Sequence, residues 1–273
     1  MSESSPRLFE ASGGVWAQLR VEAVQAAAEE PLLASYLHAS ILHHDRIEEA
    51  LSYHLAQKLG YGDLGPLQLR EVIRECYAAD TNLAAQAARD MRVVRERDPA
   101  CRTYLQPFLY FKGYGGLQAY RIAHWLWEQQ REILAYHLQS RISELFAVDI
   151  HPAAKIGSGV FVDHAHGIVI GETAVVEDDV SMLHSVTLGG TGKESGDRHP
   201  KIRRGVLIGA GAKVLGNIEV GEDARIAAGS VVLEDVKPRC TVAGIPARPV
   251  GGACCEGLMP ANEMDQRFFE PGI

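Results

Sequence analysis

The sequence has no run of 18 apolar residues, and its first ten residues are mostly polar and contain no long apolar run. A membrane span or a secretory signal needs an apolar run, so we predict neither and expect a cytoplasmic protein with no membrane partner. Positive charge is also scarce, because the formal net charge is −8 and the pI is near 5.8. Phosphate contacts need a basic surface, so the composition argues against a nucleic-acid partner.

Cysteine is scarce, and its spacing forms no pattern. The five cysteines are odd in number, and no two are spaced as C-x-x-C. They are Cys76, Cys101, Cys240, Cys254 and Cys255. A disulfide framework or a zinc site would need paired spacing, so we predict reduced thiols and no bound metal.

Helical periodicity fills the first half of the chain. Apolar residues follow the i, i+3, i+4, i+7 spacing of one helix face at Leu69, Val72, Ile73, Cys76 and Tyr77. Breaks between helices are expected at Gly60, Gly62, Gly65 and Pro66, and again at Gly113, Gly115 and Gly116, before one or two helices over residues 117–146. We therefore predict an all-helical domain over residues 1–148.

A period of six residues begins after Asp149. Twelve of thirteen positions sampled at this period are Val or Ile. They are Ile150, Ile156, Val162, Ile168, Ala174, Val180 and Val186, then Ile202, Ile208, Val214, Val220, Ile226 and Val232. Small residues often follow, as at Gly157, Gly209, Gly221 and Ala227. This repeat predicts a parallel β-helix in which each hexapeptide forms one face and the aliphatic side chains stack inward.

The two runs of the repeat are out of step. Val186 and Ile202 are sixteen residues apart, which is no multiple of six, so part of this polar, glycine-rich stretch must leave the coil as a loop. A regular coil does not need such a loop, which makes it a candidate for function. We predict an α+β fold: the helical domain, a β-helix over residues 149–250 with one excursion loop, and a flexible C-terminal tail over residues 251–273 that contributes little to the core.

Three clusters combine a carboxylate with histidine. Asp149 precedes His151, Asp163 lies beside His164 and His166, and Asp197 precedes Arg198 and His199. A histidine near a carboxylate suits a general base, and an arginine suits a substrate carboxylate. The alternatives are structural pairs without function, or a zinc site of the γ-carbonic anhydrase kind built on His164 and His166.

Longer motifs resemble one enzyme family. VDIHPAAKIG from Val148, DHAHGIVIGETAVV from Asp163 and SVTLGGTGKESGDRHPKI from Ser185 are similar to the β-helix of bacterial serine acetyltransferases. So are IGAGAKVLGNIEVG from Ile208 and, in the helical half, YAAD, RDPA, YFKG and LQAYRIAHWLW. The resemblance covers nearly the whole chain, and it implies that the β-helix is left-handed.

The resemblance also implies a role for each matching residue. It makes His164 the general base and Asp149 the carboxylate that supports it, with His199 a further catalytic group. Asp98, Asp163, Arg198 and His199 would hold serine, with Asp98 on its amino group and Arg198 on its carboxylate. Acetyl-CoA would contact Gly190, Ala210, Arg225 and Ala228. Arg225 often matches a lysine, Ala227 a glycine and His166 in some relatives a threonine, so the CoA groove departs somewhat from the family pattern.

The implied reaction is direct transfer of acetyl from acetyl-CoA to the hydroxyl of L-serine, in cysteine biosynthesis. Acetyl-CoA is a co-substrate, and no permanent cofactor is expected. The family further implies a homo-hexamer built as a dimer of trimers, feedback inhibition by L-cysteine, and docking of Ile273 into cysteine synthase. Two alternatives stay open: a hexapeptide acyltransferase for a sugar or another amino acid, and a non-catalytic partner of cysteine synthase.

Overall fold

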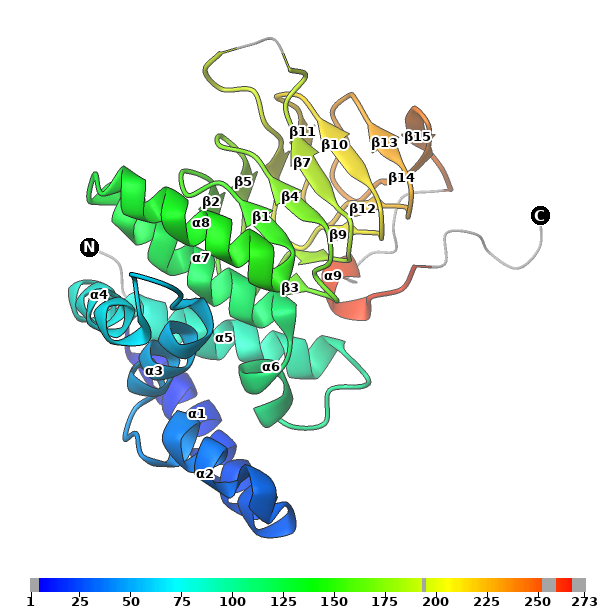
Figure 1. The fold of residues 1–273 in the computed structure, drawn as a ribbon. Helices are drawn as coiled ribbons and strands as arrows, with labels where there is room; N and C mark the ends of the chain where they lie inside the picture. The colour runs from blue at the N-terminus through cyan, green and yellow to red at the C-terminus, as the bar shows by residue number, and fades with distance from the viewer. Residues whose placement is uncertain (1–4, 193–194, 252–258, 267–273) are drawn as a thin grey trace.

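The computed structural model describes residues 5–192, 195–251 and 259–266. A helical part packs against one end of a three-sided coil of strands (Figure 1). The helical part contains α1 (Ser5–Glu29), the 3-10 turn η1 (Pro31–Leu33), α2 (Ala34–Leu37), the π-helical turn η2 (His38–Leu42), α3 (Ile47–Leu59), α4 (Pro66–Ala79), α5 (Asn82–Arg97), α6 (Leu105–Leu109), α7 (Lys112–Glu128) and α8 (Glu132–Phe146). The first strand begins at Val148 and contains Ile150, the first position of the six-residue period.

Helix α4 has the predicted apolar face. Proline at its first position lacks an N–H that would be unpaired there in any case, which favours a helix start at Pro66. Leu69, Ile73 and Cys76 are completely buried, and Val72 lies at the edge of the same face. The predicted break is confirmed, because α3 ends at Leu59.

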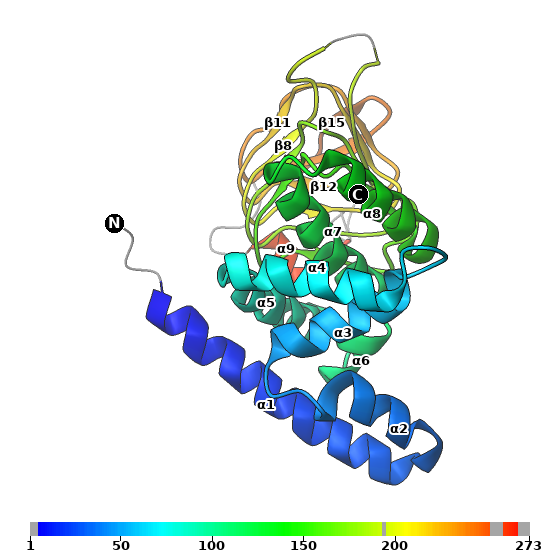
Figure 2. The same cartoon turned by 60° about the vertical axis from the view of Figure 1, so that its left-hand side comes forward.

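The predicted break at Gly113, Gly115 and Gly116 is wrong, because all three glycines lie inside α7. Their small size serves packing instead. A Cβ at Gly113 would overlap the carbonyl oxygen of Val162, and one at Gly116 would lie 3.2 Å from the Val148 side chain. Helix α7 therefore lies directly on the first coil, and Figure 2 shows α7 and α8 in front of the strands.

Three parallel sheets form the faces of the coil. Face 1 contains β1 (Val148–Ile150), β4 (Ile168–Ile170), β7 (Thr187–Gly189), β10 (Lys213–Leu215) and β13 (Val231–Val232). Face 2 contains β2 (Lys155–Ile156), β5 (Val175–Val176), β8 (Lys201–Ile202) and β11 (Glu219–Val220). Face 3 contains β3 (Phe161–Val162), β6 (Ser181–Met182), β9 (Leu207–Ile208), β12 (Arg225–Ile226) and β14 (Thr241–Gly244), with β15 (Ala247–Pro249) antiparallel at its end.

The strand register corrects the simple count of six. Val162 pairs with Met182 and Ile150 with Ile170, so the first coil has 20 residues and the step from Val162 to Ile170 is eight. The two extra residues lie in the turn that contains His164. Counting in sixes from Val162 reaches Ile168 instead of Ile170. The shift did not show in the sequence, because each hexapeptide has two buried positions and Ile168 is as well buried as Ile170.

The excursion loop is confirmed by the same register. Leu188 and Val214 are partners on face 1, and Val176 and Ile202 are partners on face 2. The step from Leu188 to Ile202 is therefore fourteen residues, eight more than one hexapeptide. The loop leaves the coil between faces 1 and 2.

A buried ion pair fixes the helical part to the first coil. Asp90 is fully buried and accepts hydrogen bonds from Arg121 (Nη2, 2.8 Å) and Gln118 (Nε2, 2.9 Å). Its other oxygen accepts from the backbone N–H groups of Gly159 (2.8 Å) and Val160 (3.2 Å). Because removal of one partner would leave a buried charge unpaired, these contacts specify how the two parts meet.

The C-terminal tail differs from the expectation over residues 259–266. Helix α9 (Pro260–Glu263) packs against α5 and β6, and Ala261 is fully buried (Figure 1). Its backbone N–H donates to the Gly205 carbonyl at 3.2 Å. This segment therefore adds to the core, although composition predicted that it would not. Ile273, Cys254 and Cys255 lie outside the described residues.

Candidate active site

Most candidate residues lie at two of the three corners of the coil. We call the turns from face 3 to face 1 the His164 corner; they comprise residues 163–167, 183–186, 209–212 and 227–230. We call the turns from face 1 to face 2 the His199 corner; its described residues are 151–154, 171–174, 190–192, 195–200 and 216–218. Face 1 separates the two corners.

The two extra residues shape the His164 corner. His164 and Ala165 both have positive φ angles, 57° and 61°, in a region that non-glycine residues seldom occupy. This backbone directs the His164 side chain outward, where 73% of it is exposed. Its Nε2 lies 3.7 Å from Asp163 Oδ2, and its ring meets the His184 ring edge-on at 5.9 Å between centroids. An accessible imidazole beside a carboxylate is the arrangement that a general base needs.

A second carboxylate approaches the His164 corner from the helical part. Asp98 follows the last residue of α5, and its Oδ1 accepts from the Ala100 N–H at 2.8 Å. Burial raises the pKa of Asp163, the His164 imidazole opposes this rise, and the negative charge of Asp98 adds to it. The two carboxylates are thus close enough to repel each other, and together they suit a cation such as an ammonium group.

Asp149 lies next to this corner on the first coil. It is the middle residue of β1, between the buried Val148 and Ile150, so its side chain points out of the coil. Its Oδ1 accepts a hydrogen bond from Gln139 Nε2 at 2.8 Å. The turn that contains His164 is fastened to the start of β1, because the Gly167 N–H donates to the Ala147 carbonyl at 3.0 Å.

The later turns of the His164 corner form a narrow column. The Gly211 N–H donates to the His184 carbonyl at 2.9 Å, and the Gly229 N–H donates to the Ala210 carbonyl at 2.8 Å. Ala210 and Ala228 therefore stack above His184 and leave the edge free of large side chains. Arg225 lies on β12 just before this edge, and its buried Nε has no partner within the described part of the chain.

The His199 corner is packed more tightly. His199 is only 7% exposed and lies on Gly171, where a Cβ would overlap the imidazole ring. Its Nδ1 accepts from the Thr173 N–H at 3.2 Å and lies 2.9 Å from Thr173 Oγ1. Burial, followed by the charge of Arg198, lowers the pKa of His199. The imidazole is therefore neutral near pH 7, with its proton on Nε2.

Arg198 lies beside His199 at the end of the excursion loop. Its Nη2 donates to Glu172 Oε2 at 2.6 Å, and this guanidinium lowers the pKa of Glu172. A Cβ on Gly190, at the start of the loop, would lie 3.4 Å from the Arg198 side chain. The loop thus returns on itself. Arg198 Nη1 also donates to the Gly196 carbonyl at 3.0 Å, and the further N–H donors of the guanidinium can bind a second carboxylate.

Comparison with known proteins assigns the chain to a family. Residues 15–119 match the model of the serine acetyltransferase N-terminal region, and residues 199–234 match the bacterial transferase hexapeptide repeat. Curated serine acetyltransferases from Salmonella typhimurium and Escherichia coli are each 58% identical over 93% of this chain and 92% of their own length. The chain belongs to the serine acetyltransferase family.

The solved structure of the Vibrio cholerae serine acetyltransferase superposes with a TM-score of 0.92 at 56% identity, covering 94% of this chain and 98% of that one. The Brucella abortus serine acetyltransferase in complex with coenzyme A superposes with a TM-score of 0.87 at 52% identity, covering 89% and 97%. The coil and the hexapeptide match confirm the predicted helical domain followed by a left-handed parallel β-helix.

Only part of the predicted serine acetyltransferase site comes together in one chain. His164, Asp163, Asp98, Ala210 and Ala228 gather at the His164 corner, with Asp149 and Arg225 alongside. Arg198, His199 and Gly190 gather at the His199 corner. One chain thus holds two separate groups of candidate residues at opposite ends of face 1.

The three carboxylate–histidine clusters behave differently in space. Within the described residues, only the cluster of Asp163 and His164 brings the two side chains within ion-pair distance. Asp197 binds Lys201 at 2.5 Å instead. His151 packs edge-on against Trp127, at 5.2 Å between centroids, and its pKa is lowered mainly by burial. Proximity in sequence was therefore a poor guide to which pairs form.

Sequence reasoning missed the neighbours that orient the site. His184, Glu172, Thr173 and Gln139 contact candidate residues but were not singled out. His184 could have been found, because it lies 20 residues after His164 and the first coil has 20 residues. The other three contacts depend on the path of the loop and on helix packing, for which no short motif exists.

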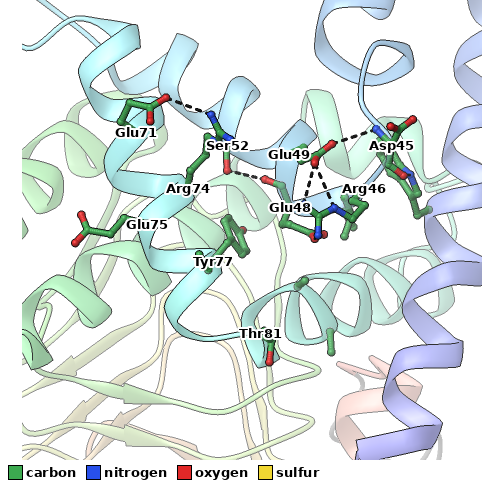
Figure 3. Close-up of a pocket in the computed structure, with 15 residues that line it drawn as sticks. Asp45, Arg46, Glu48, Glu49, Ser52, Glu71, Arg74, Glu75, Tyr77 and Thr81 are labelled. Atoms are coloured by element: carbon green, nitrogen blue, oxygen red, sulfur yellow. Dashed lines mark hydrogen bonds and ion pairs between the residues drawn. The ribbon is translucent and has the colours of Figure 1, made fainter.

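A large hollow lies in the helical part, away from both corners. It has a volume of about 860 Å³ and lies between α1, α3, α4 and α5, lined by Tyr77, Glu48 and Glu71 among others (Figure 3). In the part of the chain that the structure describes, no three histidine, cysteine or acidic side chains converge as a metal site. No described helix is long and apolar enough to cross a membrane.

Proposed function

We propose that this chain transfers the acetyl group of acetyl-CoA to the hydroxyl of L-serine, giving O-acetyl-L-serine and CoA. The observation that carries the proposal is the meeting of exposed His164, Asp163 and Asp98 at one corner, in a chain 58% identical to curated serine acetyltransferases. Serine acetyltransferases have been solved in complex with coenzyme A, with cysteine and with serine. Those complexes support acetyl-CoA as the co-substrate.

In the proposed reaction, His164 takes the proton of the serine hydroxyl while the oxygen attacks the thioester carbonyl. The tetrahedral intermediate collapses by breaking the C–S bond, and the CoA thiolate leaves and is protonated by the imidazolium. Asp149 holds the imidazole in position and stabilises its positive form. Asp98 and Asp163 bind the serine ammonium group. Arg198 and His199 bind the serine carboxylate, with His199 donating from Nε2.

This assignment requires both corners to serve one substrate. Because face 1 separates them within a chain, we propose that the His164 corner of one copy meets the His199 corner of its neighbour in a trimer. Acetyl-CoA would lie in the groove between copies, along Ala210, Ala228 and Arg225 on one side and Gly190 on the other. We further propose that the helical parts join two such trimers into a hexamer.

Regulation and partners follow the same chemistry. L-Cysteine differs from L-serine only in its thiol, so we propose that it binds the same groups as a feedback inhibitor.

We propose that Ile273 docks into cysteine synthase through its side chain and terminal carboxylate, because that enzyme binds an amino-acid carboxylate. Binding of the full chain and of a chain ending at Gln266 to cysteine synthase tests this, and equal affinities would contradict it. We also propose a cytoplasmic location, in keeping with the free Cys76 and Cys101.

Thiol release from acetyl-CoA tests the proposed reaction. The assay compares L-serine, L-homoserine and a sugar as acceptors at equal concentration. We expect rapid release with L-serine and the appearance of O-acetyl-L-serine. Faster release with a sugar or with homoserine would favour a different hexapeptide acyltransferase, and no release with any acceptor would favour the non-catalytic alternative.

A further inference from the structure

The end of α5 is held to the coil by a buried arginine. Arg97 is the last residue of α5 and is 6% exposed. Its Nη1 donates to Ser181 Oγ at 3.0 Å and to the carbonyl oxygens of Gly159 at 3.2 Å and Asp179 at 3.4 Å. Gly159 belongs to the first coil, and Asp179 and Ser181 belong to the second. One guanidinium therefore joins α5 to two successive coils.

Pairing with a carboxylate does not by itself explain why an arginine is buried at position 97. The carboxylate within reach is Asp179, whose Oδ1 lies 3.6 Å from Arg97 Nη2. The same carboxylate also pairs with Arg89 at 2.8 Å and with Arg204 at 3.4 Å. Burial of a guanidinium is costly, and apolar residues of similar volume often stabilise such a position as well. What an apolar residue would not supply is a fixed set of directional bonds to three oxygens.

The bonds of Arg97 hold the chain directly before Asp98, the proposed contact to the serine amino group. Asp98 follows Arg97 directly, and its N–H donates to the Val94 carbonyl at 3.0 Å, while Asp98 Oδ1 accepts from the Ala100 N–H at 2.8 Å. Asp98 is therefore the C-cap residue, at which α5 ends and the following turn begins. Movement of the end of α5 relative to face 3 would change the distance between the carboxylates of Asp98 and Asp163.

The docked part of the C-terminal tail completes the contact. Ser181 Oγ accepts from Arg97 and donates to the Ala261 carbonyl at 2.8 Å. Met264 packs against the cluster of Val93, Val94, Cys101 and Phe161, on either side of the α5 terminus. The segment thus covers the bonds between Arg97 and Ser181 and limits the access of water to them.

We propose that Arg97 is a positioning residue that holds Asp98 opposite Asp163, and that the α9 segment supports it through Ser181. The inference rests on the proposed function, because it takes Asp98 as the contact to the serine amino group. It assigns a role to a residue that does not touch the substrate, and it links the docked tail segment to recognition of the amino acid.

Steady-state kinetics of the full-length enzyme test the proposal. Arg97→Lys keeps the charge but loses the planar fork, so we expect the KM for serine to rise about 10-fold, with kcat and the KM for acetyl-CoA changed less than 2-fold. Ser181→Ala should raise the serine KM by a smaller factor. Arg95→Lys is the matched control, because Arg95 is exposed on the same helix turn and stacks on Tyr104 instead.

A double-mutant cycle separates positioning from general destabilisation. Once Asp98→Asn has removed the carboxylate, adding Arg97→Lys should raise the serine KM by less than 2-fold more. Additive effects, equal rises in both KM values, or an unchanged serine KM in a folded Arg97→Lys enzyme would each overturn the proposal. If Arg97→Lys fails to fold, the same cycle with Ser181→Ala decides. A wild-type enzyme that does not acetylate serine would refute the proposed function instead, before any variant is compared.

Discussion

The two corners of the β-helix differ in the number of inserted residues and in the exposure of their histidine. The His164 corner gains two residues, and its histidine projects into solvent with 73% of the side chain exposed. The His199 corner gains eight residues, yet its histidine is buried on Gly171 and bonded to Thr173. Insertion length therefore does not decide which histidine is accessible.

The contrast fits a division of labour. A general base must reach its substrate and exchange a proton, which favours an open imidazole. A group that recognises a carboxylate must keep a fixed geometry, which favours a packed one. Each of these roles leads to a measurable expectation for one of the two histidines or its neighbours.

The largest expected effect is on catalysis at the open corner. His164→Ala should lower kcat by roughly 10²- to 10⁴-fold, the usual contribution of a positioned general base. The fold should survive, because the side chain lies outside the buried ladder. His166→Ala, in the same turn and also exposed, is the control and should retain most activity. A His164→Ala enzyme with more than half of the wild-type kcat would remove this residue from the mechanism.

Mixed oligomers test whether the two corners meet between copies. His164→Ala and Arg198→Ala chains, each nearly inactive under subsaturating serine, are refolded together in equal amounts. If each site takes one corner from each of two neighbouring chains, about a quarter of the sites in random trimers become intact. Activity should recover to about that fraction of wild type. No recovery in verified mixed trimers would mean that each chain uses its own two corners.

A smaller effect is expected on recognition at the packed corner. Arg198→Ala removes a charge-assisted fork, so the serine KM and the cysteine inhibition constant should both rise, by roughly 10- to 100-fold. Arg203→Ala is the control, because Arg203 follows β8, pairs with Glu177 after β5 and lies outside the corner. Loss of cysteine inhibition with unchanged serine binding would show that the two amino acids use different sites.

The smallest expected effect is on the pH dependence of stability. The pKa of His199 is lowered in the folded chain, so unfolding takes up a proton below the ordinary histidine value near 6.5. With respect to His199, the folded state therefore keeps its full stability above that pH and loses stability as the pH falls below it. Through His199, a fall from pH 7.5 to 5.5 should lower the free energy of unfolding by at most about 1.4 kcal/mol.

Denaturant titrations at both pH values check this. His199→Gln should flatten the pH dependence, because the glutamine side chain does not titrate. Equal slopes in the wild type and in His199→Gln would show that the packed histidine does not titrate as proposed.

The sequence predicted the fold class well but not its local register. Stacked hexapeptides repeat one chemical environment, so Val and Ile at every sixth position were enough to predict the coil. The shift of two residues near His164 stayed hidden, because Ile168 and Ile170 are both buried and either keeps an apolar count going. Register depends on which strands pair, and composition at single positions does not encode that.

Glycine and the tail show a second limit. The same residue that ends helices also permits close packing, and only the contact of Gly113 with Val162 distinguishes the two uses. Likewise, the polar composition of the tail predicted an extended segment, but Ala261 and Met264 fit a gap between α5 and β6 that exists only in the folded molecule. The site residues were predicted through family motifs, and their distribution over two corners depended on the topology.

Both ends of the coil carry features that disfavour the addition of strands from another molecule. A stack of parallel strands has two open edges, and an open edge can pair with the edge of another molecule to form a fibre. Here α7 and α8 cover the first coil, and β15 folds back antiparallel on β14 with Pro249 and the exposed Arg248 along it. Proline and charge both disfavour addition of a further strand. Strand addition is therefore disfavoured at the first coil, which α7 and α8 cover, and at the end of face 3, which β15 covers.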